Sequence, residues 1–274
     1  MIEHTPPCPA VRAFCVGQAK SGTASLYGLL ATSYRASHEP EREQILEMIL
    51  RESRGEIDDE AFVQYLIRRD QRLNLEYDIA WANQFLVRHL LVAFPAARFV
   101  VLVRDPYSWL QSIVGHLISR QIPSDVRSFL DWWFNPERYP HTRHDRALQS
   151  SGVYSIAALL NAWNEHVDLC TKSLPRERRL LLRTHELDRS GCQLAEFLQI
   201  PSESLNTRQG HLNRSSWMGR VQSMVDGAYL SDMVGQICGV NMTCHFPEIS
   251  GIEDVGPLWD QPRPPASNPR QKKF

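Results

Sequence analysis

The segment RFVVLVRDPYSWLQS spans residues 98–112 and carries the strongest fold signal in the chain. Its five successive apolar residues, 99–103, are typical of a strand buried on both faces of a parallel sheet. Asp105 suits a helix N-cap and a proline follows it, which predicts a helix over residues 107–118. Arg104 would therefore lie at the carboxyl end of a buried strand, the edge where open α/β sheets bind ligands.

Strands and helices alternate on both sides of this segment. An apolar strand is predicted over residues 13–16, ended by Gly17, and a helix over residues 24–30 after a polar loop. The remaining predicted elements are helical stretches at 41–73, 81–93, 153–169 and 194–198 and a strand at 179–183. This order predicts an α/β fold in which helices flank a central parallel sheet of the P-loop nucleotide-binding kind.

The chain of 274 residues is predicted to form a single domain, residues 1–274, because no linker interrupts it. Its core would cover residues 12–248, and residues 251–274 would form a proline-rich tail. Residues 121–151 are polar and aromatic and are predicted to be partly loop. The aromatic residues there, among them Trp132 and Trp133, suit a cover over a substrate pocket or an ordinary core equally well.

Charge and cysteine content exclude several classes of protein. Lys and Arg number 30 against 31 Asp and Glu, so the bulk charge predicts neither a nucleic-acid nor a membrane partner. No stretch has the roughly 18 apolar residues of a membrane helix, and residues 1–11 lack a signal-peptide core. The six cysteines show no zinc-site spacing, which predicts no metal and a cytoplasmic location, although a Cys238–Cys244 disulfide stays open.

The loop from Gly17 to Thr23 is a candidate phosphate site. It precedes a predicted helix, whose unpaired backbone N–H groups and dipole favour an anion at that end. Lys20 adds a positive charge, and hydroxyl donors come from Ser21, Thr23 and Ser25. The alternative is an ordinary Gly/Ser turn with a solvated lysine.

The same loop differs from the Walker A sequence GxxxxGK[ST]. Gly17 and Gly22 have the required separation, but Thr23 stands where Walker A has lysine, and Lys20 comes two residues before the second glycine. This shift counts against a kinase or ATPase with the usual Lys and Mg²⁺ geometry. A P-loop kinase and a non-catalytic nucleotide-binding scaffold remain the two alternative functions.

Arg104 and Ser112 form a second candidate anion site. The guanidinium group offers a planar fork of donors that matches phosphate oxygens. Ser112 follows eight residues later, on the helix predicted after Pro106. The alternative is that Arg104 pairs with an acidic neighbour.

Taken together, residues 14–26 and 104–112 resemble the family of sulfotransferases that use 3′-phosphoadenosine 5′-phosphosulfate (PAPS). Residues 94–95, 182–187 and 194–201 also resemble the corresponding segments of this family. The resemblance implies that the loop carrying Gly17 binds the 5′-phosphosulfate through Lys20, Ser21, Gly22, Thr23 and Ser25. It implies that Arg104 and Ser112 bind the 3′-phosphate. In the family a late loop also reaches this phosphate, and Arg214 is the nearest candidate here.

The implied reaction is an in-line displacement at sulfur that releases 3′-phosphoadenosine 5′-phosphate (PAP). Lys20 would stabilise the charge that develops on the departing phosphate oxygen, so no metal is required. The acceptor hydroxyl needs a base, and His38 and Glu39 are adjacent candidates. Histidine suits this role at neutral pH, whereas Glu39 would need its pKa raised by burial. Alternatively, both residues merely lead into a helix.

The predicted acceptor is a small molecule with a hydroxyl group, such as a phenol, a glycoside or another natural product. Neither its identity nor the oligomeric state follows from a single sequence, because specificity lies in variable loops.

Overall fold

The computed structural model describes residues 12–207 and 220–256. A five-stranded parallel sheet lies at its centre, with strand order β2-β3-β1-β4-β5. The strands are β1 (Ala13–Gly17), β2 (Ala36–His38), β3 (Tyr77–Ala80), β4 (Arg98–Val103) and β5 (Arg179–Arg183). β1 pairs with β3 on one side and β4 on the other, so its carboxyl end opens in the middle of one sheet edge. The predicted α/β fold with a parallel sheet is confirmed.

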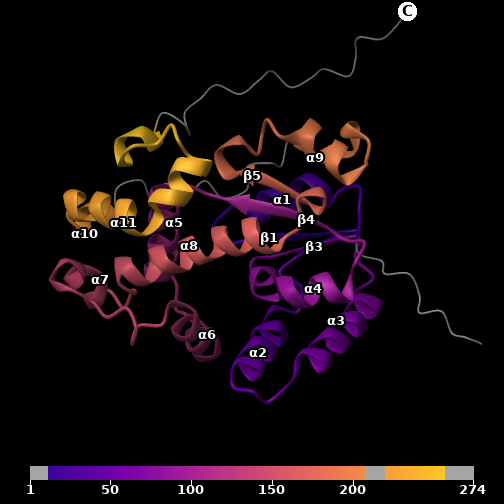
Figure 1. The fold of residues 1–274 in the computed structure, drawn as a ribbon, viewed down its shortest axis with the longest axis horizontal. Coiled ribbons are helices and arrows are strands. Elements are labelled where there is room, and N and C mark those ends of the chain that lie inside the picture. The colour runs from indigo at the N-terminus through magenta and orange to yellow at the C-terminus, as the bar shows by residue number, and fades with distance from the viewer. Residues whose placement is uncertain (1–11, 208–219, 257–274) are drawn as a thin grey trace, which may run out of the picture.

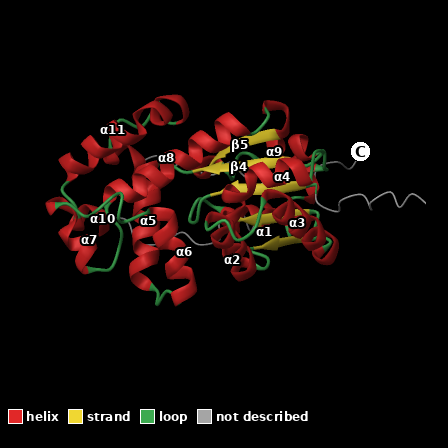
Figure 2. Ribbon diagram, turned by 60° about the horizontal axis from the view of Figure 1, so that its bottom comes forward, coloured by secondary structure: helices red, strands yellow, loops and turns green. Residues whose placement is uncertain are grey.

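Helices cover both faces of the sheet (Figures 1 and 2). In order they are α1 (Thr23–Leu30), α2 (Arg42–Ser53), α3 (Asp59–Leu73), α4 (Val87–Ala93), α5 (Pro106–Ser119), α6 (Ser124–Phe134), α7 (Arg146–Ser150), α8 (Ile156–Ser173), α9 (Gly191–Leu198), α10 (Arg220–Met224) and α11 (Gly227–His245). A 3₁₀ segment, η1 (Trp81–Leu86), precedes α4, and five shorter 3₁₀ turns are η2 (Arg143–Asp145), η3 (Arg176–Arg178), η4 (Thr184–Glu186), η5 (Ser202–Ser204) and η7 (Ile252–Asp254). Figure 1 shows α5, α7, α10 and α11 gathered at one end of the molecule, away from α3 and α9.

The core has two layers because side chains of a strand alternate between the sheet faces. Phe14 and Val16 of β1 belong to the larger cluster, which also takes in α4, α5 and α8. Ala13 and Cys15 belong to the smaller one, together with α1 and α9. The strands therefore need apolar residues at nearly every position, as the runs at 13–16 and 99–103 predicted.

Several element boundaries differ from the sequence prediction. The stretch 41–73 is two helices, because Gly55 takes a left-handed φ of 72° after α2 and Asp58 caps α3. The stretch 121–151, predicted to be partly loop, contains α6 and α7, and α6 places Phe129, Trp133 and Phe134 on the core. The stretch 81–93 begins as a 3₁₀ turn before α4.

Three elements were missed: β3, the short helix α10 and α11. β3 is only four residues long and contains Asp78, whose buried carboxylate accepts a hydrogen bond from Arg69 at 2.5 Å. A charged residue in so short a run hides the apolar signal, and the ion pair that makes it tolerable lies nine residues away. α11 packs along α8, and nothing in the sequence around residues 227–245 had been used to predict it.

Three further expectations concern the rest of the chain. Cys238 and Cys244 are both free thiols, so the disulfide left open is not formed. None of the helices within residues 12–207 and 220–256 combines the length and apolar character needed to cross a membrane. Most of the predicted tail, residues 257–274, lies outside the described residues. The single-domain boundaries stay a prediction.

Candidate functional site

The candidate site lies at the sheet edge where β1, β2 and β4 end. The loop after β1 carries Lys20, β2 ends at His38, and Arg104 follows β4. Since β1 lies between β3 and β4, residues far apart in the sequence meet at this edge. The predicted loop, base and guanidinium are thus brought together by sheet topology.

The loop between β1 and α1 is tightly turned. Lys20 adopts a left-handed φ of 71° and Gly22 a φ of 103°. A side chain at Gly17 would come 2.6 Å from Ser21 Oγ, so glycine is required where the loop begins. Only a residue without Cβ adopts the Gly22 conformation without cost, and this turn leads directly into α1.

Side chains from other elements hold the loop in place. Ser21 donates its hydroxyl to the Gln18 carbonyl at 2.7 Å, and Thr184, after β5, donates to the Ser21 carbonyl at 2.6 Å. Gln18 donates its amide to the Ala162 carbonyl of α8 at 3.0 Å. The Ser21 side chain, predicted to bind the donor, therefore closes the loop in this structure.

The amino end of α1 has no side-chain cap, a feature that it shares with α2, α4, α6, α7 and α9. Its N-cap is Gly22, and no acidic residue stands in its first turn. By contrast, Asp58, Asp105, Ser155 and Asp226 cap α3, α5, α8 and α11. Within the described residues, neither a side-chain cap nor a first-turn acid offsets the positive end of the α1 dipole. Thr23 and Ser25 of this first turn are both buried.

Lys20 and Arg104 are close to each other. The Arg104 guanidinium donates to the Lys20 carbonyl at 3.1 Å, across 84 positions of sequence. Burial, with the charges of Arg104 and Arg120, lowers the pKa of Lys20. Burial likewise lowers the pKa of Arg104 to about 10, against the opposing effect of Asp105. Burial and the nearby guanidinium thus disfavour the charged form of Lys20, and a bound anion would relieve this effect.

Arg104 is held from three sides. Its Nε donates to Ser108 Oγ at 2.9 Å, and the Ser108 hydroxyl in turn donates to Asp105. The Arg104 carbonyl accepts the indole N–H of Trp163 at 2.8 Å. Asp105 also accepts from the backbone N–H of Ser108 at 2.8 Å and so caps α5. The acidic neighbour thus acts as the helix cap and reaches the guanidinium through Ser108.

Ser112 lies on the same side of α5 as Ser108 and His116. Residues four apart are neighbours on a helix, so these three form one stripe along α5. One end of the stripe contacts Arg104 through Ser108. At the other end, burial and the charges of Lys20 and Arg120 lower the pKa of His116 to about 4. Ser112 lies between them along the helix and is buried.

His38 and Glu39 are adjacent at the end of β2. His38 Nε2 lies 3.0 Å from the Thr23 hydroxyl and 3.6 Å from Glu39 Oε1. Burial lowers the pKa of His38, so its neutral form is favoured at neutral pH. The structure therefore connects the candidate base to the first turn of α1.

Glu39 is buried, and its pKa is raised, as the role of a base would require. Burial raises its pKa to about 7, although the backbone N–H of Trp81 donates to Oε1 at 3.2 Å and opposes this rise. Its other oxygen, Oε2, is buried with no hydrogen-bond partner among the described residues. Its φ of 56° is left-handed, a strain typical of functional positions.

Several residues that support the site were not predicted. Trp109 donates its indole N–H to the Ala19 carbonyl at 2.9 Å, and Gln18 and Thr184 fasten the loop as described above. The one available signal was position, because Gln18 and Thr184 both follow predicted strands directly. Arg214, the predicted late contact, lies outside the described residues.

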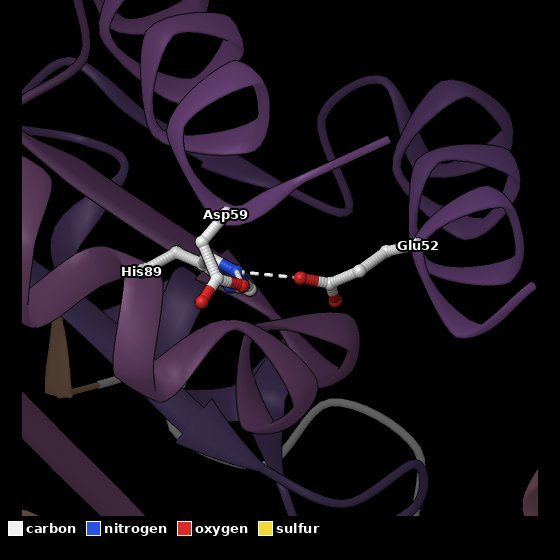
Figure 3. A group of neighbouring side chains, drawn as sticks. All are labelled: Glu52, Asp59 and His89. Atoms are coloured by element: carbon white, nitrogen blue, oxygen red, sulfur yellow. Dashed lines mark hydrogen bonds and ion pairs between the residues drawn. The ribbon is translucent and has the colours of Figure 1, made fainter. Parts of the chain in front are cut away.

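A separate cluster has the spacing of metal ligands (Figure 3). Among the described residues, Glu52, Asp59 and His89 place one ligand atom each within 4.8 Å of one another. Arg88 already contacts both carboxylates, at 2.6 Å to Glu52 and 3.2 Å to Asp59. The guanidinium and His89 Nε2, 2.7 Å from Glu52, satisfy these acids as an ion-pair network. The cluster therefore does not call for a metal.

Comparison with known proteins places the chain among a recognised group. The sequence profile of the family described as "Sulfotransferase domain" matches residues 12–207. A solved sulfotransferase from Alicyclobacillus acidocaldarius is 16% identical, with a TM-score of 0.46 over 85% of this chain and 95% of that one. The sulfotransferase domain of the Synechococcus PCC 7002 olefin synthase is 15% identical, with a TM-score of 0.37 over 93% and 96%. No curated protein sequence matches.

Proposed function

Since this chain belongs to the sulfotransferase-domain family, we propose that it moves a sulfuryl group from PAPS to a hydroxyl group of a small-molecule acceptor and releases PAP. The observation that carries the proposal is the contact between Arg104 and Lys20 at the edge of the sheet. Two cations and an uncapped helix N-terminus meet there, which suits a ligand with several anionic groups.

The two ends of the donor would take different parts of this site. The 5′-phosphosulfate would lie over the loop, at Lys20 and the amino end of α1. The 3′-phosphate would lie at Arg104 and Ser112, where a planar guanidinium and a hydroxyl are available. This division follows the family resemblance, and the stripe of Ser108, Ser112 and His116 supports it by continuing from Arg104 along α5.

Lys20 would act on the leaving group. As the bond between sulfur and the bridging oxygen breaks, negative charge grows on the 5′-phosphate of PAP. An ammonium group beside that oxygen stabilises the transition state more than the bound donor. The place of Lys20 supports this role, because it lies in the tightly turned loop just before the amino end of α1.

His38 would act as the base. Its lowered pKa keeps it neutral, so it can take the proton from the acceptor hydroxyl while the acceptor oxygen bonds to sulfur. The carboxyl group of Glu39, 3.6 Å from Nε2, would stabilise the resulting imidazolium when ionised. In this scheme His38 takes the proton, the acceptor oxygen takes the sulfuryl group and Lys20 stabilises the leaving phosphate. No step requires a metal ion.

Titration calorimetry with PAP, in buffer containing EDTA, tests the donor site. Wild-type protein should bind PAP without a divalent metal, and Arg104→Ala should weaken binding roughly 10- to 100-fold, because a charged hydrogen-bonding partner is lost. Lys20→Ala should lower the release of PAP from PAPS by about 100-fold or more. Exposed Arg51 and Lys172, changed to alanine, are the matched controls and should leave both values unchanged.

A nucleotide kinase would give the opposite pattern. Tight binding of Mg-ATP together with no binding of PAP would overturn the proposal. Binding of PAP without turnover on any hydroxyl acceptor would favour the non-catalytic scaffold.

A further inference from the structure

A cavity of about 300 Å³ lies between η1, α6 and α8. Its size is at the lower end of the range typical of small-molecule sites, about 300–1,000 Å³. Its walls include Phe85 of η1, Trp132 and Trp133 of α6, and Tyr139 after α6. The facing wall on α8 contains two alanines, 158 and 162, whose small side chains leave the space open.

The aromatic wall is rigidly packed from behind. Trp133 stacks on Trp81 with ring centres 5.5 Å apart and planes at 17°. The Phe85 ring lies edge-on to Trp133, with ring centres 5.4 Å apart. It is tilted against the Trp132 ring, with centres 5.5 Å apart. Trp132 lines the cavity and is 39% exposed, so its ring is accessible to a ligand. Rings fixed in this way offer a flat molecule a preformed surface.

Hydrogen bonds link the surroundings of this cavity to the proposed reaction site. Trp81, behind the aromatic wall, donates its backbone N–H to Glu39. On the opposite wall, Ala162 accepts the hydrogen bond from Gln18 of the loop. The two walls are therefore tied to the candidate base on one side and to the donor loop on the other.

The mouth of the cavity is charged. Arg138 and Glu165 line it from opposite walls, and both are exposed. Deeper, His166 is buried, and burial lowers its pKa to about 4, so this imidazole is neutral. The cavity therefore combines a neutral, ring-lined interior with a rim of two opposite charges.

We propose that this cavity binds the acceptor, and that the acceptor is a planar aromatic compound with a hydroxyl group. This inference rests on the proposed sulfuryl transfer. The ring lies between Phe85 and Trp133 and the two alanines of α8, with the reacting hydroxyl toward Glu39 and His38. A polar substituent at the other end reaches Arg138 and Glu165. Trp132, at the rim, is a specificity residue for the ring.

Equilibrium dialysis with 2-naphthol and its saturated counterpart, decahydro-2-naphthol, tests this assignment. The two probes share a hydroxyl and a ring skeleton but differ in aromaticity. Wild-type protein should bind 2-naphthol about 10-fold more tightly than the saturated alcohol, since aromatic pairs add to the burial of apolar area. Trp132→Ala should weaken 2-naphthol binding roughly 3- to 10-fold and reduce this preference.

A second variant and a control keep the test decisive. Ala158→Leu should fill the cavity and remove 2-naphthol binding, while Trp132→Ala tests the same site without placing bulk in the core. Val92→Ala changes another exposed apolar residue, on α4 and outside the cavity, and should have no effect. Equal affinity for the two alcohols, or unchanged affinity in Trp132→Ala, would overturn the proposal.

Separate measurements distinguish this inference from the proposed function. Each titration is repeated with and without PAP, and PAP binding is measured for every variant. PAP should bind all variants equally, because none changes the donor site. Loss of 2-naphthol binding with intact PAP binding therefore supports the acceptor cavity. Failure of the wild type to bind PAP would count against sulfuryl transfer, while the 2-naphthol result would still decide the nature of the cavity.

Discussion

At the scale of single residues, burial accounts for most of the site's chemistry. Glu39 is only 16% exposed, and its pKa is raised to about 7, while burial lowers the pKa of its neighbour His38. Two adjacent groups with opposite charges in their ionised forms are thus both moved toward neutrality.

The raised pKa of Glu39 predicts a pH-dependent effect on stability. Its folded-state value of about 7 exceeds the ordinary 4.5, so its contribution is fully favourable below pH 4.5 and is lost as the pH rises through 7. Glu39→Gln should therefore raise the free energy of unfolding at pH 8, by up to about 3 kcal/mol, and not at pH 4.5. Urea denaturation at both pH values measures this, with exposed Glu196→Gln as the control.

The same pair predicts separable effects on turnover. His38→Ala should lower turnover by about 100-fold or more while PAP binding stays unchanged, because a base is lost and the donor site is not. Glu39→Gln should lower turnover less, since it removes only stabilisation of the imidazolium. Turnover of His38→Ala close to the wild-type value would exclude His38 as the base.

At the scale of elements, the helices α5 and α8 hold the donor loop from outside. Trp109 of α5 donates to the Ala19 carbonyl, and Trp163 of α8 donates to the Arg104 carbonyl. α8 also receives the Gln18 amide at Ala162. The loop and the guanidinium are thus fixed by two helices that themselves pack together, which is how a short loop keeps a strained conformation.

Trp109→Phe tests this support. The change keeps an aromatic ring in the core but leaves the Ala19 carbonyl without its indole donor, which should cost about 1 kcal/mol of stability. PAP affinity should fall several-fold, because the loop loses one anchor. Calorimetry and thermal unfolding together measure the two effects.

Tyr154→Phe is the matched control for this change. It removes the 2.6 Å hydrogen bond that the Tyr154 hydroxyl donates to Asp131. Asp131 lies on α6, away from the donor loop. Its stability should fall by a similar amount while PAP affinity stays the same. Equal losses of PAP affinity in both variants would show that Trp109 acts only through general stability.

At the scale of the whole molecule, buried His166 and half-buried His116 make the fold sensitive to acid. Burial lowers the pKa of His166 to about 4, and His116 reaches about 4 through burial and nearby cations. Both folded-state values lie below the ordinary 6.5. Their contribution to stability is therefore complete above pH 6.5 and is lost as the pH falls toward 4.

His166→Gln should weaken this acid sensitivity. For wild type, His166 alone accounts for up to about 3 kcal/mol lost between pH 6.5 and 4, because the unfolded chain binds the proton first. The free energy of unfolding of wild type, minus that of His166→Gln, should therefore decrease by up to about 3 kcal/mol as the pH falls from 6.5 to 4. Denaturation at several pH values measures it, and half-exposed His144→Gln is the control. A constant difference across the range would contradict the assignment.

The sequence by itself determined the features that depend on neighbours along the chain. The apolar run 99–103, the Asp105 cap and the glycine-bounded loop after residue 16 all appear where predicted, because strand burial, capping and turns are local. The family could also be recognised from the sequence, since the segments 14–26 and 104–112 carry its motifs. β3 and α11 escaped because neither shows a sufficiently clear local pattern.

Only the tertiary structure decided what these residues meet. The bond from Arg104 to Lys20, the contact of Thr23 with His38 and the N–H of Trp81 at Glu39 join segments 15 to 84 positions apart. The raised pKa of Glu39 and the ring-lined cavity also depend on packing across the molecule. Contacts and burial of this kind arise from the order of strands in the sheet, which no local pattern of residues encodes.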